Sequence, residues 1–384
     1  MANDSLCIYG FEVIEEMKGK NITASDELTW PCGLRIFWVD TLPFVTLTRG
    51  LLYYGTSIIV AVGILLNTVS FMVLTRKNMR KSPTSLYLSS LTIYNMLTLT
   101  MNLMVGVLRG QNESVNKHFQ SNEGLCMFHG VVVELFNLLS VWIIVAFTCD
   151  RLFMIKFPQQ ARSASRRKAF AVVIIVSGIL VLVSLHKVAV SGFEDDSVFS
   201  YKACKTRREI VKDIIYVYVA LNTWIPTILI VAINIVIIVE VKKSKSKLQN
   251  MTNSSMSRSD ERITKILLLV STTYVLLVLP LGIVQTIELI WNSTMKFIPG
   301  EKGYEHFMMT KIKLKWTRAF FFFFYQFNYA INFFLFITSS SARQFRTTLK
   351  KLLGMEASRE ELRTSRLSPR NVVVPACFSQ ADST

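Results

Sequence analysis

Charged residues are scarce in this sequence. Asp, Glu, Lys and Arg make up 18% of its 384 residues, whereas hydrophobic residues make up 51%. A soluble globular protein usually has about a quarter charged residues. The shortage is concentrated in seven apolar stretches, each long enough to cross the roughly 30 Å hydrocarbon core of a bilayer as a helix. These stretches are 51–74, 86–108, 125–149, 169–185, 214–239, 266–287 and 319–341.

Within these stretches, His, Asp, Glu, Lys and Arg are confined to the third, which contains His129 and Glu134. No stretch has the polar stripe that a soluble amphipathic helix exposes. In lipid, every backbone polar group needs a partner inside its own segment, so the stretches are predicted to be helices rather than an open sheet. The sequence therefore predicts an all-α integral membrane protein with a seven-transmembrane helix bundle.

The sequence also lacks the residue groups that catalysis needs. It has no paired carboxylates, metal-ligand cluster or nucleophile beside a base, and its four histidines are scattered. We therefore expect no enzyme activity, cofactor or metal. The net charge of +17 has no soluble domain to present it to nucleic acid, and part of it is assigned to anchoring on anionic lipid. A channel or transporter is disfavoured, because no internal repeat appears and only the third helix carries charge.

Charge in the loops predicts the orientation. The first 30 residues contain no basic start followed by an apolar run, as a signal peptide would, so the first helix is expected to set the topology. The basic cluster 76–81 follows that helix and is cytoplasmic by the positive-inside rule, which places the N-terminus outside and the C-terminus inside. The loops 152–168 and 240–262 are basic and fall inside, although the loop 292–318, placed outside, is basic too.

Glycosylation sequons in the segments assigned to the outside fit this orientation. They begin at Asn3, Asn21, Asn112 and Asn292. The expected location is the plasma membrane, as a multi-pass glycoprotein.

The chain is expected to have four parts. Residues 1–49 form an extracellular N-terminal segment, 50–341 the transmembrane domain, 342–353 an amphipathic helix on the membrane surface, and 354–384 a disordered cytoplasmic tail. Apolar and basic residues of 342–353 mostly occupy opposite helical faces, which is typical of an interfacial helix. The tail is rich in Ser, Thr and Arg and has little to bury. It is either a target of a receptor kinase and arrestin or a solvated tail of no particular role.

A charged pair, Asp150-Arg151, closes the third stretch at its inner end, and Arg151 follows Cys126 by 25 residues. That separation is about seven helical turns, enough to span the membrane. Pro158 follows in the next inner loop. This set resembles the rhodopsin-like (class A) G-protein-coupled receptors, over about residues 50–350. The resemblance continues in helices one, five, six and seven with Asn67, Pro226, Pro280 and Asn332.

The resemblance implies roles for particular residues. Arg151 would pair with Asp260 and hold the bundle closed until a ligand separates them and exposes a site for a heterotrimeric G protein. Cys126 would form a disulfide with Cys204, the alternative being two unrelated thiols. Cys7 and Cys32 could also pair outside. The residues assigned to coupling and activation are Asp150, Arg151, Asp260, Thr264, Asn95, Asn332, Phe336 and Pro280.

Several motifs of the family are altered. Asn95 replaces the helix-two aspartate that normally holds a sodium ion, and Asn234 replaces a helix-five tyrosine. The usual tryptophans of helices four and six are missing, and the helix-seven motif lacks its proline and its tyrosine. Those places read Ser177-Gly178, Leu277-Val278-Leu279 and Asn332-Phe333-Phe334-Leu335-Phe336. The last of these, together with Asp-Arg-Leu in helix three, resembles invertebrate neuropeptide receptors of the FMRFamide type.

Single positions exclude two ligand classes of the family. Val133 stands where amine receptors have an aspartate, and Gln326 stands where opsins have the lysine that binds retinal. A membrane-buried carboxylate usually faces a wet cavity, so Glu134 is either a contact for a basic ligand group or a structural partner of a neighbouring helix. The basic outer loops would attract acidic ligand residues, unless they only form a solvated rim. The candidate ligand-binding residues are Val133, Glu134, Asn137, Gln285, Glu288, Tyr325 and Gln326.

The long polar outer segments favour a peptide over a small apolar ligand. The sequence thus predicts a cell-surface receptor that binds an extracellular peptide, most simply a neuropeptide, and activates a heterotrimeric G protein. Two alternatives stay open. One is a scavenger or decoy receptor that binds without signalling, because some switches are missing, and the other is a chemosensory receptor for a small molecule.

Overall fold

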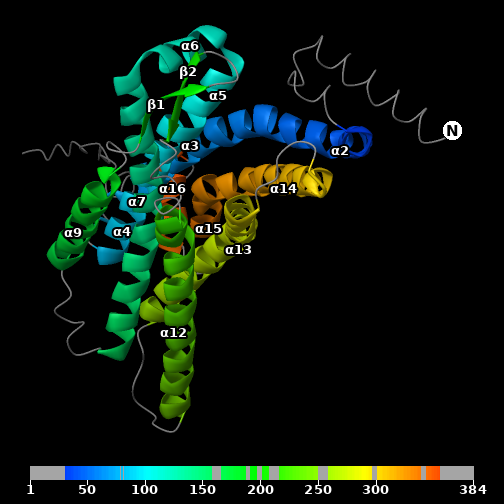
Figure 1. Cartoon of the computed structure of the whole chain (residues 1–384). Helices are drawn as coiled ribbons and strands as arrows, with labels where there is room; N and C mark the ends of the chain where they lie inside the picture. Colours follow the sequence, from blue (N-terminus) through cyan, green and yellow to red (C-terminus); the bar gives the residue numbers. More distant parts are fainter. Residues whose placement is uncertain are drawn as a thin grey trace, which may run out of the picture.

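The protein is described from a computed structural model. The described residues are 31–77, 79–80, 82–157, 166–186, 191–196, 201–206, 216–249, 258–295, 301–338 and 343–354. Long helices dominate this part of the chain (Figure 1). Six of the described helices are long and apolar enough to cross a membrane: Cys32–Leu74, Pro83–Arg109, Glu123–Lys156, Arg166–Ser184, Tyr216–Lys243 and Thr264–Thr294. The predicted seventh crossing lies in α14 (Tyr304–Ala330) and α15 (Asn332–Thr338).

The first, second and fifth crossings each contain a short π-helical segment. The first consists of α2 (Cys32–Gly50), η2 (Leu51–Gly55) and α3 (Thr56–Leu74). The second consists of α4 (Pro83–Thr98), η3 (Leu99–Met104) and α5 (Val105–Gln111), and a short α6 (Glu113–Ser121) follows it. The fifth runs through η4 (Ala220–Trp224) into α12 (Ile225–Gln249). Such π segments are often found at functional sites.

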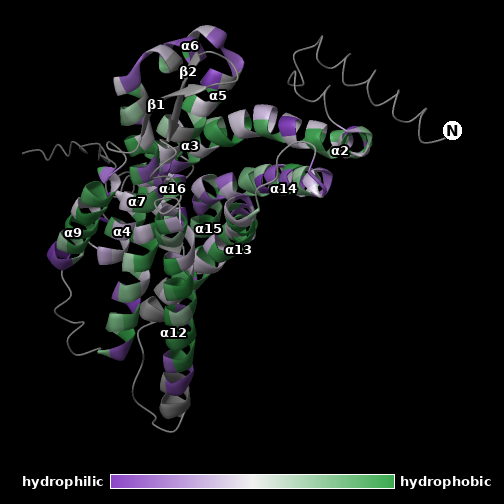
Figure 2. Ribbon diagram, in the orientation of Figure 1, coloured by the Kyte–Doolittle hydropathy of each residue, from purple (hydrophilic) through white to green (hydrophobic). Residues whose placement is uncertain are grey.

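The third, fourth and sixth crossings are α7 (Glu123–Lys156), α9 (Arg166–Ser184) and α13 (Arg258–Thr294). Below, the outer end of the bundle is the end where α13 finishes and α14 begins, and the inner end is the one with the Asp150-Arg151 pair. Figure 2 shows hydrophobic residues covering α9 and α12, with hydrophilic residues near their inner ends. Exposed apolar side chains along α9, such as Ile175 and Leu182, fit a lipid-facing surface.

Hydrogen bonds join neighbouring helices inside the bundle. The Tyr94 hydroxyl of α4 lies 2.8 Å from the Ser177 hydroxyl of α9, at the place of the missing helix-four tryptophan. The indole N–H of Trp142 in α7 donates to the carbonyl oxygen of Leu221 at 3.0 Å. The bundle therefore pairs buried polar groups across helices, as burial in an apolar medium requires.

The seventh helix begins earlier than predicted. We expected a loop over 292–318 and a crossing over 319–341, but α14 starts at Tyr304, and the helix is interrupted at Ile331 between α14 and α15. The outer part of α14 contains three lysines between 311 and 315, so its apolar face was not recognised from the sequence. Ile312 and Trp316 of that face pack on Leu34, Trp38 and Val45 of α2. Figure 1 shows α2 and α14 running side by side.

The first helix also starts earlier than its predicted crossing, because α2 begins at Cys32 and continues into the bundle. Residues 1–30 lie outside the described part. The expectation of an all-α fold needs one addition, a short antiparallel hairpin of β1 (Ser191–Asp196) and β2 (Tyr201–Thr206). The sequence around it is rich in charged residues and has no clear alternation, so it did not predict strands.

After the bundle, α16 (Arg343–Leu352) lies within the expected amphipathic segment. Phe345 is buried, and its ring lies against those of Phe333 and Phe336 in α15. Apolar side chains therefore attach this basic helix to the inner end of the bundle.

Candidate functional site

A cavity of about 290 Å³ lies near the outer end of the bundle. It is bounded by η2, α7, the start of the fifth crossing, α13 and α14. The lining residues are Leu52, Asn137, Tyr218, Asn222, Thr223, Leu281, Gln285, Lys315, Trp316, Arg318, Ala319, Phe322 and Tyr325. Two of the three π segments thus contribute side chains to it.

Uncharged hydrogen-bonding groups form one part of the lining. The Asn137 amide N–H donates to the Tyr218 hydroxyl at 3.4 Å, and the Asn137 carbonyl oxygen accepts from the Tyr329 hydroxyl at 3.2 Å. The Tyr329 hydroxyl is also hydrogen-bonded to that of Tyr325. Asn137, Tyr325 and Tyr329 are buried, so this network is held away from solvent and fixes the direction of each polar group.

This network reaches the irregular part of the seventh helix. The Asn67 amide of α3 donates to the backbone oxygen of Tyr329 at 2.7 Å, two residues before the interruption at Ile331. Asn332, after the interruption, donates to the Asn328 carbonyl oxygen at 3.1 Å. Side chains therefore satisfy backbone oxygens at a place where the family usually has a proline.

Cationic side chains gather at the mouth of the cavity. Two cations lie near the Trp316 ring, with Arg49 of α2 at 5.1 Å and Lys315 at 5.7 Å from its centroid. Arg318 forms an ion pair with Glu288 of α13. Lys315 is exposed and lines the cavity.

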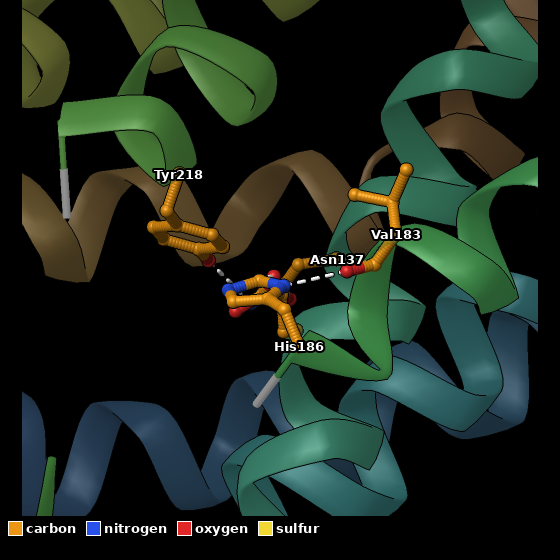
Figure 3. Close-up of polar contacts among 5 residues, drawn as sticks. Asn137, Val183, His186 and Tyr218 are labelled. Carbon is orange, nitrogen blue, oxygen red and sulfur yellow. Dashed lines mark hydrogen bonds and ion pairs between the residues drawn. The ribbon is translucent and has the colours of Figure 1, made fainter. Parts of the chain in front are cut away.

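The structure brings three predicted ligand contacts, Asn137, Gln285 and Tyr325, together in the cavity lining. Glu134 is elsewhere: its carboxylate is 3% exposed and lies 3.6 Å from Nε2 of His186, just beyond α9. Nδ1 of His186 lies 2.5 Å from the Val183 carbonyl oxygen. Figure 3 shows His186 beside Asn137, with Val183 and Tyr218 on either side.

The other ligand candidates are not in the cavity lining. Glu288 does not line the cavity, but it forms an ion pair with Arg318, which does. Val133 is half-buried in α7. Gln326 is fully buried, and its amide has no hydrogen-bond partner among the described residues.

At the inner end, Arg151 is buried and forms an ion pair with Asp150 at 2.7 Å. Its guanidinium also lies 5.5 Å from the centroid of Phe147. Thr264, four residues after Asp260, is buried. The side chain of Asp260 lies outside the described part of the structure. The expected pairing of Arg151 with Asp260 therefore remains a prediction.

The remaining activation candidates lie in the core of the bundle. Asn95 accepts a hydrogen bond from the Ser140 hydroxyl at 2.6 Å. Pro280 lies inside α13, and Phe336 is buried against α16. Asn234 of α12 donates to the Ser271 hydroxyl of α13 at 2.7 Å, so the residue that replaces the family's tyrosine joins helices five and six.

The side chains of Cys126 and Cys204 lie outside the described residues, although Cys126 is in α7 and Cys204 pairs with Phe193 in the hairpin. Their disulfide remains a prediction, as does a pairing of Cys32 with Cys7.

The sequence profile of the family described as 7 transmembrane receptor (rhodopsin family) matches residues 67–332. The chain belongs to this family. It is a receptor family, so the expectation that the chain is not an enzyme is confirmed. The match also confirms the predicted seven-helix membrane bundle, since it extends from Asn67 of the first crossing to Asn332 of the seventh.

A relative named "Rhodopsin, GQ-coupled", from Mizuhopecten yessoensis, is 23% identical over 308 residues. The similarity covers 75% of this chain and 60% of the relative, so this chain spans less than two thirds of the relative's length. Gln326, at the position where the sequence analysis expects the retinal-binding lysine of an opsin, is buried, and residues 319–341 contain no lysine.

Sequence reasoning missed part of the cavity. Lys315, Trp316 and Arg318 were not among the predicted contacts, because the seventh helix was expected to begin at 319. Tyr218 lies within the predicted fifth crossing but was not selected as a contact. The available signal was the apolar spacing of Met308, Ile312 and Trp316, which recur every four residues and so lie near one face of a helix.

Proposed function

We propose that this chain is a cell-surface receptor that binds an extracellular peptide and activates a heterotrimeric G protein in response. The observation that carries the proposal is the position of two sites on one helix. Asn137 lines the cavity and Arg151 closes the inner end, and both belong to α7, roughly 21 Å apart along its axis. A ligand in the cavity thus contacts the helix that presents the Asp-Arg pair.

The proposed G-protein partner is supported by family membership and by that pair. The relative's printed name describes it as GQ-coupled, which supports the same class of partner here. Activation would separate Arg151 from its partners and move the inner end of α13, with Pro280 as the pivot. Arrestin, a receptor kinase and membrane lipids complete the proposed partners.

The small volume of the cavity, and the α2–α14 pair that extends from it, support a peptide ligand. A volume of about 290 Å³ is at the lower limit of small-molecule sites. It would hold the terminal residues of a peptide. The α2–α14 pair, which extends from the cavity mouth, would contact the remainder. Peptides of the FMRFamide type are the basic, amidated alternative within this proposal, and the library experiment below separates them from acidic peptides.

The proposed orientation has the cavity mouth outside the cell, at the plasma membrane. Two of the proposed glycosylation sites agree with it, because Asn112 caps α6 and Asn292 lies in the last turn of α13, both at the outer end. Asn3 and Asn21 lie outside the described residues.

The test is G-protein activation in cells that display the full chain, challenged with a library of neuropeptides in amidated and free-acid forms. Arg151→Ala should abolish the response without lowering surface display. Lys156→Ala is the matched control, because Lys156 is exposed at the same helix end and should tolerate the change.

The alternative of a receptor that binds without signalling makes a different prediction. Labelled peptide would then bind at the surface and be internalised, with no G-protein response from the wild-type receptor. A response that survives Arg151→Ala would contradict the proposed coupling route.

A further inference from the structure

We infer that the cavity recognises a ligand with a carboxylate group, and that Lys315 is its main partner at the mouth. This inference rests on the proposed function for the identity of the site, and it adds the chemical class of the ligand. It follows from the charges around the mouth and from the uncharged character of the interior.

The two cationic residues in the cavity lining are not equivalent. Lys315 and Arg318 both line the cavity, and the carboxylate of Glu288 forms an ion pair with Arg318. Glu288 is already committed to Arg318, and its side chain is 14% exposed. Among the described residues, Lys315 forms no ion pair, and the neighbour of its ammonium group is the Trp316 ring.

The position of Lys315 favours a ligand over a role in stability. Lys315 lines the cavity, and its ammonium lies 5.7 Å from the centroid of the buried Trp316 ring. An exposed surface lysine gains little from a solvated position, but one at the edge of a partly desolvated cavity attracts anions more strongly. Arg318 would stay on Glu288 and orient the mouth.

The interior carries no charged side chain. Asn137, Asn222, Gln285, Tyr218 and Tyr325 supply amides and hydroxyls, and Glu134 is not among the lining residues. Its carboxylate lies 3.6 Å from His186. A basic ligand group would therefore find no carboxylate partner in the lining. An anionic group at the mouth with a neutral polar or aromatic group inside matches both regions.

A carboxylate can come from an acidic side chain or from a free peptide C-terminus, and the experiment separates these sources. The first measurement uses purified full-length receptor and simple probes. N-acetyl-aspartate amide carries the side-chain acid, N-acetyl-leucine the terminal acid, and N-acetyl-asparagine amide is the neutral control. Thermal unfolding is followed at increasing millimolar concentrations of each probe.

We expect at least one acid to raise Tm by about 2 °C or more near saturation, and the neutral control to have no such effect. Lys315→Gln should abolish the shift. Lys311→Gln is the matched control, because Lys311 is exposed one turn away and does not line the cavity. Absence of a Lys315-dependent shift with both acids overturns the inference.

The second measurement uses G-protein activation by hexapeptide libraries with Asp, Asn or Lys fixed at each position in turn and with acid or amide ends. Active libraries should contain an acid, and Lys315→Gln should lower their potency at least tenfold. Lys315→Glu should shift the preference toward Lys. If amidated libraries with no acid are equally potent on the wild type, the inference is overturned while the proposed peptide receptor stands.

The two proposals fail separately. A Lys315-dependent carboxylate shift in a receptor that no peptide activates supports the anion site and counts against the peptide-activated function.

Discussion

The hydrogen bond between Asn234 and Ser271 should restrain the inner half of α13 in the inactive receptor. Asn234 replaces the tyrosine that the family uses in helix five, and its amide donates to the Ser271 hydroxyl at 2.7 Å. Ser271 in turn donates to the Leu267 carbonyl oxygen of its own helix at 2.8 Å. Both side chains are buried. When the inner end of α13 moves outward, this contact between helices breaks.

The size of the effect follows from the type of bond. A neutral buried hydrogen bond contributes about 0.5–1.5 kcal/mol net. If the bond exists only in the closed bundle, Asn234→Leu shifts the equilibrium toward the open state by about 2- to 13-fold. Ser271→Ala should have the same sign, although it leaves the buried Asn234 amide without this partner in both states.

The assay is agonist-independent G-protein activation, normalised to surface display. Trp224→Phe is the control, because it removes a 2.9 Å hydrogen bond between the same two crossings, to Thr286 near the outer end, where no opening is proposed. Unchanged basal activity in Asn234→Leu, or an equal rise in Trp224→Phe, would refute the reasoning.

Three further predictions concern stability. A Cβ added at Gly282 would overlap the methyl carbon of buried Thr223. Gly282→Ala should therefore lower the free energy of unfolding by about 1–2 kcal/mol, after allowing for the better helix propensity of alanine. Adding Thr223→Ser, which removes that methyl group, should restore most of the lost Tm. Gln326→Leu should raise Tm, because it removes a buried amide with no partner among the described residues; a lower Tm would indicate a bound water or ligand group there. Replacing choline chloride with sodium chloride should leave the Tm of the wild type unchanged, because the Asn95 oxygen already accepts a hydrogen bond from Ser140. The same change should raise the Tm of the Asn95→Asp variant. A sodium-dependent Tm in the wild type would contradict this prediction.

The sequence was sufficient to predict the crossings of the membrane, because a bilayer demands about 20 apolar residues per helix and tolerates few charges. It was insufficient where helices continue beyond the bilayer. There the apolar face of α14 is narrow, the other faces carry lysines, and the partner that buries Trp316 is α2, some 270 residues earlier in the chain.

The same contrast applies to the site. Asn137, Gln285 and Tyr325 could be chosen because polar side chains in a crossing are rare and usually face the interior. Glu134 satisfied that rule too, yet its carboxylate faces His186 just beyond α9. A polar side chain inside the bundle can line the cavity or contact a residue of a neighbouring helix. The neighbouring helix decides between the two, and a single sequence does not show which residues are neighbours.

The uninterrupted length of α14 has a mechanical consequence. From Tyr304 to Ala330 it is a single rod of roughly 40 Å, clamped to α2 at one end and interrupted at Ile331 at the other. A force applied to the outer end of a stiff helix tilts the whole helix. A force on the outer end of α14 would therefore be transmitted past the cavity to the interruption at Ile331. The part of a peptide that binds the α2–α14 pair would therefore influence the break in the seventh helix without itself entering the cavity.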